Sequence, residues 1–303
     1  MRTEAPITLA AIAERAGRLG FRERDRADLL SAAPDLLSDP DRRAMIAERA
    51  ELLRAGIGRL AVDGPDPWSA LSDPDDDGLL PLLSLLVVAP DVVGYQRGRG
   101  VTESQAWRNL SDLGQQVWVH RLVYGRFGLH NHGWLRIAWA GGFAWLGRLQ
   151  FNLQHLPESD EWVLSTHIPR RGTGAGDPGA LSPDAVRESF ALAADFYATH
   201  FEDVPTSDFW CRSWLLAPEL ADALPGSNIA AFQRLWLLDD ELGDGDDDAV
   251  YFTFARRRPW KPDDLPRDSR LEHAVTARLA RGEHWPVRSG RIAHAPVRAD
   301  QPR

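Results

Sequence analysis

The chain has 303 residues, of which 44% are hydrophobic and 26% charged, and its net charge is −9. This length and composition predict a folded protein of two domains, and a single cysteine, Cys211, excludes an intramolecular disulfide. An acidic body without an RRM, zinc-finger or helix-turn-helix signature argues against binding to nucleic acid. We expect a cytoplasmic protein with no membrane partner. The polar N-terminus is unlike a signal peptide, and the apolar stretch 79–89 is shorter than the roughly 20 residues of a membrane span.

Residues 1–135 are expected to form an all-helical domain, because apolar residues recur there at helical spacing. Asp39-Pro40 is typical of a helix start, since Asp caps free N–H groups and proline has no N–H to leave unsatisfied. Thr102 followed by Gln105 predicts a capping box that opens a long amphipathic helix.

Residues 136–285 are expected to form a mixed α/β domain, so the fold class is α+β. Ser182-Pro183 and Ser227 predict two capped helices, and a further helix is expected to end at Gly282. Four segments show the alternation or short apolar run of a strand: 145–154, 160–168, 209–215 and 250–255.

Residues 286–303 are interpreted as a basic C-terminal tail. From Arg256 to Arg303 there are twelve Arg and Lys residues against six Asp and Glu residues, a local charge of +6 in an otherwise acidic chain. Such a basic region either contacts nucleic acid or an acidic cofactor, or is a solvated C-terminal helix followed by a loose end.

Five motifs in a fixed order carry a resemblance to a known family. They are 147–151 (GRLQF), 167–169 (HIP), 181–183 (LSP), 211–216 (CRSWLL) and 227–233 (SNIAAFQ). Together they resemble the acyltransferase-like family that joins an N-acyltransferase N-terminal domain to a GNAT-like C-terminal domain. The chain departs from the family at Arg212, where a histidine is expected between the cysteine and the serine.

The resemblance implies a GNAT-like, mixed and mostly antiparallel sheet with flanking helices. It implies an enzyme that moves an acyl group from acetyl-CoA or another acyl-CoA to an amine or hydroxyl of a small-molecule acceptor. His130 and His132 have metal-like spacing, but no acid lies near them in the sequence, so we expect no metal. In GNAT folds the CoA pyrophosphate binds at a loop before a helix, where backbone N–H groups attract anions. The corresponding residues here are Arg170, Arg171, Gly172, Thr173, Gly174 and Gly176. The rival interpretation of this loop is a plain connector, because Asp177 and Asp184 bring negative charge to it.

Three side chains are candidates for catalysis. His167 at a strand end is a candidate general base, or a polar strand-end residue bonded to backbone. Cys211 is a candidate nucleophile, or a small buried apolar residue, and Ser213 is a candidate proton donor to the departing thiolate, or a hydroxyl bonded to the sheet.

The substrate cleft is expected to contain Arg148, Gln150 and Asn152, a polar row on one strand face, together with Asn228. The alternatives are pairing of the row across an interface and a helix-cap role for the segment around Asn228. Two functions therefore stay open, an acyl-CoA-dependent acyltransferase and a non-catalytic GNAT-like module that binds acyl-CoA or a protein partner.

Overall fold

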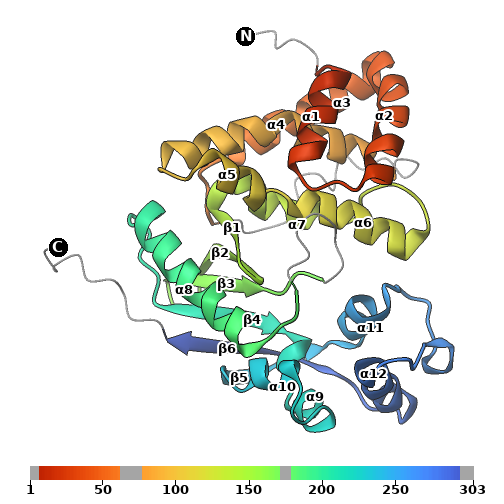
Figure 1. Cartoon of the computed structure of the whole chain (residues 1–303), viewed down its shortest axis with the longest axis vertical. Coiled ribbons are helices and arrows are strands. Elements are labelled where there is room, and N and C mark those ends of the chain that lie inside the picture. The colour runs from red at the N-terminus through yellow and green to blue at the C-terminus, as the bar shows by residue number, and fades with distance from the viewer. Residues whose placement is uncertain (1–6, 62–76, 171–178, 294–303) are drawn as a thin grey trace, which may run out of the picture. The chain divides into compact units, whose positions relative to one another are not determined.

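The computed structural model describes residues 7–61, 77–170 and 179–293 (Figure 1). The chain divides into two compact units, and the main boundary falls between Trp145 and Leu146 rather than at residue 135. We call the part up to Trp145 the N-terminal unit and the part from Leu146 the C-terminal unit.

The described part of the N-terminal unit is helical until its last few residues. Its elements are α1 (Leu9–Arg18), α2 (Glu23–Ser38), α3 (Pro40–Gly56), α4 (Leu79–Gly98), α5 (Glu103–Asn109), α6 (Asp112–Tyr124), α7 (His132–Ile137) and the π-helix η2 (Ala138–Gly142), followed by strand β1 (Phe143–Leu146). The expected helical N-terminal region is confirmed.

The helix starts follow their local signals to different degrees. The Asp39 carboxylate accepts hydrogen bonds from the N–H groups of Asp41 and Arg42, as the sequence predicts for this cap. Thr102 also caps α5 through the N–H of Gln105. The predicted long helix is nevertheless wrong, because a break after α5 separates it from α6.

Helix α4 is the buried centre of the N-terminal unit. It extends from Leu79 to Gly98, well beyond the apolar stretch 79–89. By length and composition it is apolar enough to cross a membrane, but 67% of its apolar window is buried inside the protein. The apolar side chains on both sides of α4 therefore pack against neighbouring helices, as in a core helix.

Helix α6 approaches the end of α1 more closely than a side chain allows. The Gly114 N–H donates to the Leu19 carbonyl oxygen at 3.2 Å. A Cβ atom at Gly114 would lie 2.5 Å from that same oxygen, so only glycine permits this contact.

The C-terminal unit is built on a sheet whose order is β1-β2-β3-β4-β6-β5. Strands β3 and β4 are parallel, and β2–β3, β4–β6 and β5–β6 are antiparallel, which confirms the expected mixed, mostly antiparallel sheet. The remaining strands are β2 (Leu149–Leu156), β3 (Glu161–His167), β4 (Asp208–Ser213), β5 (Leu237–Asp244) and β6 (Pro286–Ala293).

The described helices of this unit lie between the strands in sequence. They are α8 (Pro183–His200), η3 (Trp214–Leu216), α9 (Pro218–Ala223), α10 (Asn228–Gln233), α11 (Asp246–Phe254), η4 (Pro262–Asp264) and α12 (Arg270–Ala280). Ser182 and Ser227 cap α8 and α10 through their hydroxyl oxygens, as their sequence positions predict.

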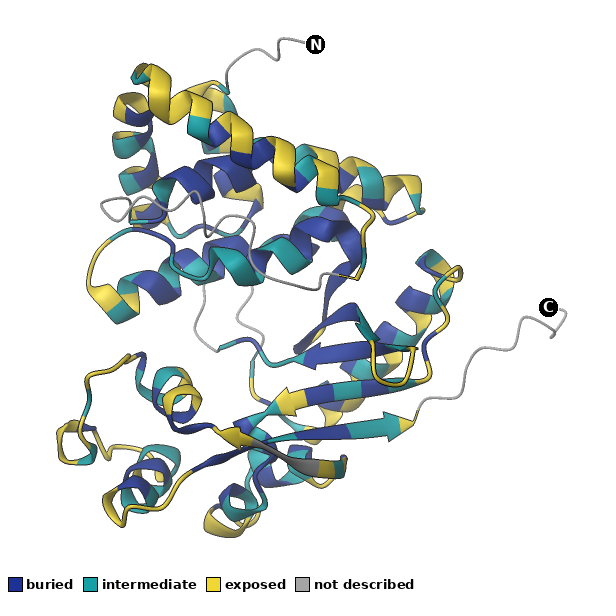
Figure 2. Cartoon of the chain, turned by 180° about the vertical axis from the view of Figure 1, so that it is seen from behind, coloured by how far each residue is buried: buried dark blue, intermediate teal, exposed yellow. Residues whose placement is uncertain are grey.

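Helix α8 covers one face of the sheet and closes its core. The rings of Phe151 (β2), Phe190 (α8) and Phe209 (β4) contact one another with centroids 4.7–5.9 Å apart. The Tyr197 hydroxyl donates to the Phe151 carbonyl oxygen at 2.8 Å. Figure 2 shows the central strands mostly buried or half-buried and the exposed residues mainly on helices and loops. The α8 face of the sheet is thus an aromatic core.

Two predicted strands of the C-terminal unit are corrected by the structure. The expected strand 145–154 is two strands, because β1 ends at Leu146 and Gly147 turns the chain with a φ of +61°. The expected strand 250–255 is instead the end of α11, which closes at Phe254 with Ala255 as its C-cap. Three aspartates in the first turn of α11 favour a helix N-terminus, and this outweighs the β propensity of the aromatic residues.

The predicted basic tail is wrong for residues 286–293. These residues form β6, which lies between β4 and β5 in the sheet. The basic side chain of Arg291 is paired there with Glu161 and Asp208, each at 3.2 Å. The positive charge of Arg291 is therefore neutralised by acids on β3 and β4.

Candidate active site

The parallel pair β3–β4 is the feature that organises the candidate site. Helix α8 connects the two strands, and Leu164 and Ser165 pair with Phe209 and Trp210. In the described part of the chain the pairing between these strands ends there, while β4 continues along β6 as far as Ser213. The two strands thus separate near His167, the last residue of β3.

A row of polar side chains lies on the sheet face opposite the aromatic core. Gln150 and Asn152 alternate with Phe151 along β2, and both are buried, with 3% and 6% of their surface exposed. Arg148, just before the strand, is 5% exposed. The three side chains are therefore not part of a solvated strand surface. The substrate cleft that we expected around them stays a prediction.

His167 is joined to this row by a hydrogen bond. Its Nε2 lies 2.6 Å from Asn152 Oδ1, and Asn152 Nδ2 donates to the Leu153 carbonyl oxygen at 2.8 Å. The second bond fixes the orientation of the amide, so Nε2 of the histidine carries the proton and donates it. Nδ1 is then the basic nitrogen of the ring.

The environment of His167 keeps the ring neutral. Part of its surface is exposed, yet protein atoms surround the imidazole closely, and this burial lowers its pKa to about 3. Burial removes water from around the ring, and this disfavours its charged form. A general base with this pKa is present in the right protonation state at neutral pH but has little driving force for accepting a proton.

Cys211 and Ser213 lie on the other face of the sheet. Both alternate with Arg212 along β4 and share the face of Phe209, against α8. Cys211 is 1% exposed, and burial raises its pKa to about 12. The nucleophile predicted at Cys211 is thus corrected to a core residue, because a thiol of this pKa gives almost no thiolate.

The hydroxyl of Ser213 has a local structural role. Its Oγ accepts a hydrogen bond from the Leu215 N–H at 3.1 Å and caps η3. Asn228, the fourth residue expected in the cleft, is exposed at the start of α10. Helix α10 contacts α8, so Asn228 does not join the polar row.

Most of the expected phosphate loop lies outside the described residues. This applies to Arg171, Gly172, Thr173, Gly174 and Gly176, whose predicted contact with CoA stays a prediction. Arg170 is described, and its guanidinium donates to the Phe252 carbonyl oxygen at 2.7 Å, with longer bonds to its two neighbours at the end of α11. A contact with a CoA phosphate has to compete with these bonds.

Two buried serines near the site were not singled out from the sequence. Ser165 is 1% exposed and is the cross-strand partner of Asn152. Its position two residues before His167 is the signal, since alternate residues of a strand share a face. Ser189 of α8 accepts a hydrogen bond from the Arg148 N–H at 2.8 Å and so fixes the turn before β2.

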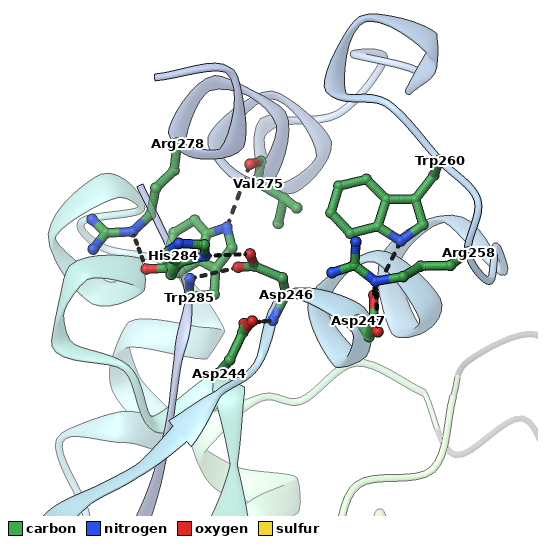
Figure 3. Close-up of polar contacts among 9 residues, drawn as sticks. All are labelled: Asp244, Asp246, Asp247, Arg258, Trp260, Val275, Arg278, His284 and Trp285. Atoms are coloured by element: carbon green, nitrogen blue, oxygen red, sulfur yellow. Dashed lines mark hydrogen bonds and ion pairs between the residues drawn. The ribbon is translucent and has the colours of Figure 1, made fainter. Parts of the chain in front are cut away.

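A separate cluster of polar groups joins the end of β5 and the start of α11 to the residues just before β6 (Figure 3). Asp244, Asp246 and His284 offer ligand atoms within 4.8 Å of one another. The Asp246 carboxylate already accepts bonds from His284 Nδ1 at 2.7 Å and from the Trp285 N–H at 2.8 Å. Asp244 accepts from the Asp246 N–H at 2.8 Å. These bonds give the cluster a structural role in fixing the start of α11.

The comparisons with known proteins cover nearly the whole chain. Residues 10–141 match the model of the N-acyltransferase N-terminal domain, and residues 143–292 match that of the GNAT-like C-terminal domain. No curated protein matches the chain.

Solved structures of acyltransferases are similar over more than nine tenths of the chain. A mutant acyltransferase in complex with octanoyl-CoA is 28% identical, with a TM-score of 0.82, over 96% of this chain and 90% of its own. An acyltransferase in complex with decanoyl-CoA is 31% identical, with a TM-score of 0.78, over 93% and 87%. A complex with decanoyl-CoA and teicoplanin is 30% identical, with a TM-score of 0.77, over 92% and 86%.

Proposed function

The chain belongs to the acyltransferase family with an N-acyltransferase N-terminal domain and a GNAT-like C-terminal domain, and we propose that it transfers an acyl group from acyl-CoA to a small-molecule amine or hydroxyl. The observation that carries this proposal is the separation of β3 and β4 beyond Ser165, beside the buried polar row. Strands that part in this way offer backbone hydrogen-bonding groups to an amide-bearing ligand such as the pantetheine arm of CoA.

The phosphate end of CoA is proposed to bind near the start of α8. This helix is 18 residues long, begins at the Ser182 cap and directly follows the β3 connection, so its first N–H groups and its dipole favour an anion there. The loop glycines 172, 174 and 176 precede this helix in the sequence.

The proposed reaction needs few side chains. The acceptor nitrogen or oxygen attacks the thioester carbonyl carbon, the C–S bond breaks, and CoA leaves as a thiolate. The proton lost by the acceptor passes through a base and finally protonates the CoA sulfur. Positioning of the two substrates and polarisation of the carbonyl by a backbone N–H supply most of the rate in such a scheme.

His167 is proposed as the base. It ends β3 at the point where the strands part, and its hydrogen bond to Asn152 directs its basic Nδ1 away from that residue. We assign Cys211 no part in the chemistry, and the hydroxyl of Ser213 is already used in a cap.

The donor is proposed to be a medium-chain acyl-CoA rather than acetyl-CoA. Similar structures hold octanoyl-CoA and decanoyl-CoA, and one of them also holds teicoplanin. The acceptor is accordingly proposed to be a small molecule with an amine or hydroxyl. The enzyme is proposed to act in the cytoplasm, where acyl-CoA is made.

Release of CoA from octanoyl-CoA and from acetyl-CoA, measured with a thiol reagent in the presence of amine and hydroxyl acceptors, tests this function. We expect acceptor-dependent release that is faster with octanoyl-CoA, and acylated acceptor by mass spectrometry. The buried Cys211 does not interfere with the reagent in the folded protein. Octanoyl-CoA binding without turnover on any acceptor would overturn the enzymatic proposal.

A non-catalytic module that binds acyl-CoA is the second candidate. Two observations favour it, the presence of Arg212 where the family pattern has histidine and the depressed pKa of His167. Calorimetric binding of octanoyl-CoA together with zero turnover would establish this function in place of the first.

A further inference from the structure

The N-terminal unit contains a cavity that is separate from the proposed acyl-CoA site. Its volume is about 460 Å³, which lies in the range of pockets for small ligands. It lies between the end of α1, the helix α5 and the first turn of α6. Its lining includes Arg18, Trp107, Arg108, Gln115 and Trp145. We call it the α1–α5–α6 pocket.

A buried amide network fixes the wall that Trp145 forms. Asn109 Oδ1 accepts hydrogen bonds from the Trp145 N–H at 3.0 Å and from Gln105 Nε2 at 2.6 Å. Gln105 Nε2 also donates to the Trp145 carbonyl oxygen at 3.1 Å, and Asn109 Nδ2 donates to Gln96 Oε1 at 3.0 Å. The backbone N–H and C=O of Trp145 are therefore both hydrogen-bonded, and this wall of the pocket is preformed.

Three buried polar atoms of the lining have no hydrogen-bond partner in the described part of the chain. One is Nε1 of the half-buried Trp107. The other two are Nε1 of Trp145, a donor on a residue that is 4% exposed, and Oε1 of Gln115, an acceptor on a residue that is 3% exposed. Buried polar groups are almost always hydrogen-bonded, and an unsatisfied one costs about 1–3 kcal/mol. A ligand in the pocket satisfies Trp145 Nε1 and Gln115 Oε1 if it brings one acceptor and one donor.

The charges around the pocket leave one cation in excess. Arg18 and Glu103 neutralise each other in an ion pair of 2.6 Å. Arg108 lies over the Trp145 ring at 5.2 Å, and among the described residues its guanidinium has no acidic partner. Burial lowers its pKa, so an anion that shares the pocket restores the stability of its charged form.

We propose that the α1–α5–α6 pocket binds a small aromatic carboxylate that also carries a hydroxyl group. The carboxylate binds the Arg108 guanidinium and the indole Nε1–H of Trp145, the hydroxyl donates to Gln115 Oε1, and the aromatic ring packs between the indoles of Trp107 and Trp145. One ligand thereby satisfies the Trp145 donor, the Gln115 acceptor and the excess positive charge. This site is independent of the proposed acyl transfer.

The test uses 4-hydroxyphenylacetate as the probe on the full-length protein. Phenylacetate lacks the hydroxyl and 4-hydroxyphenylacetamide lacks the charge, so the pair separates the two polar contacts. The indole N–H signal of Trp145, assigned with Trp145→Phe in ¹⁵N-labelled protein, reports binding. We expect 4-hydroxyphenylacetate to shift this signal saturably and to bind about ten-fold more tightly than the amide, as for a charge-assisted hydrogen bond.

Two variants and one control complete the experiment. Arg108→Gln is expected to weaken 4-hydroxyphenylacetate about ten-fold, and Arg59→Gln, an exposed arginine outside the pocket, to leave it unchanged. Gln115→Leu is expected to abolish the preference for 4-hydroxyphenylacetate over phenylacetate. This second result remains informative if Arg108→Gln does not fold.

Three outcomes overturn the proposal. The first is no shift of the Trp145 signal at tens of millimolar 4-hydroxyphenylacetate, and the second is equal affinity in Arg108→Gln and the wild type. The third is displacement of the probe by octanoyl-CoA with the same indole shifts, which assigns the pocket to the acyl-CoA site. Failure of acyl transfer in the wild type leaves the binding result unaffected, so the two proposals fail separately.

Discussion

Replacement of His167 by glutamine separates a catalytic from a structural role of this side chain. Glutamine retains a hydrogen-bond donor toward Asn152 Oδ1, which the histidine meets at 2.6 Å, but it is not a base. If His167 is the general base, kcat with octanoyl-CoA is expected to fall about 10²–10⁴-fold. At 1.36 kcal/mol per factor of ten, the activation barrier then rises by about 2.7–5.4 kcal/mol.

A purely structural role predicts a different result. The variant then loses at most the net value of one hydrogen bond, about 0.5–1.5 kcal/mol in the free energy of unfolding, and keeps its kcat. The assay pairs CoA release with urea unfolding. His155→Gln is the matched control, because His155 lies on β2 and is paired with Asp160 at 2.9 Å, away from the β3–β4 separation. An unchanged kcat in a folded His167→Gln variant refutes the proposed base.

The pH dependence of stability gives an independent measure of the same side chain. Burial lowers the folded-state pKa of His167 to about 3, whereas the unfolded chain has the ordinary value near 6.5. The unfolded state therefore binds the proton first as pH falls. Stability is unaffected above pH of about 6.5 and decreases below it by up to about 1.4 kcal/mol per pH unit from this group. His167→Gln removes this contribution, and a slope equal to that of wild type contradicts the assigned pKa.

Three further predictions concern the fold. Cys211→Ala is expected to keep acyl transfer and to lose about 1–2 kcal/mol of stability, and the wild-type thiol to react with a thiol reagent only after unfolding. Gly114→Ala is expected to lower the urea midpoint, because its Cβ meets the Leu19 carbonyl oxygen at 2.5 Å, whereas Gly94→Ala, with open space around it, raises the midpoint slightly. The hydrogen bond from Asp246 raises the pKa of His284 in the folded protein. The pair therefore stabilises the folded state below the ordinary histidine pKa, and this stabilisation is lost as pH rises through the folded-state pKa. NMR titration of Asp246→Asn should show a lower His284 pKa than in the wild type.

Local signals in the sequence were sufficient for most helix boundaries in both units. The caps at Asp39, Ser182 and Ser227 all form as predicted, because each needs only a side-chain oxygen and N–H groups two or three residues away. Strand β3 was likewise predictable from its own composition. Features that depend on residues close in sequence were therefore well determined.

Features that depend on residues distant in the sequence could not be predicted from local signals. The basic composition of 286–293 indicates a tail only when the acids that pair with Arg291 on β3 and β4 are unknown. Helix α11 has aromatic residues typical of a strand, and its start is fixed by the bonds of Asp246 to His284 and Trp285. The candidate site could not be predicted for the same reason. The hydrogen bond between His167 and Asn152 follows from the β2–β3 register and not from either segment alone.

The low pKa of His167 has a consequence for the order of events in the proposed reaction. A base with a pKa of about 3 cannot remove a proton from a free ammonium ion, because the equilibrium lies many pH units toward the ammonium. The acceptor amine must therefore bind uncharged, and its proton becomes acidic only after attack on the thioester places positive charge on nitrogen. The developing anion on the carbonyl oxygen then raises the pKa of the nearby imidazole, as any approaching negative charge does. An amine acceptor should accordingly give a kcat/KM that rises with pH up to the pKa of the free amine, with no inflection from His167 near neutrality. Since kcat/KM reports the pKa values of the free enzyme, an inflection near pH 6.5 that disappears in His167→Gln would contradict the low pKa of the unliganded ring. The same inflection in kcat alone would show that substrate binding restores an ordinary histidine pKa, and would require the ring to become solvated in the complex.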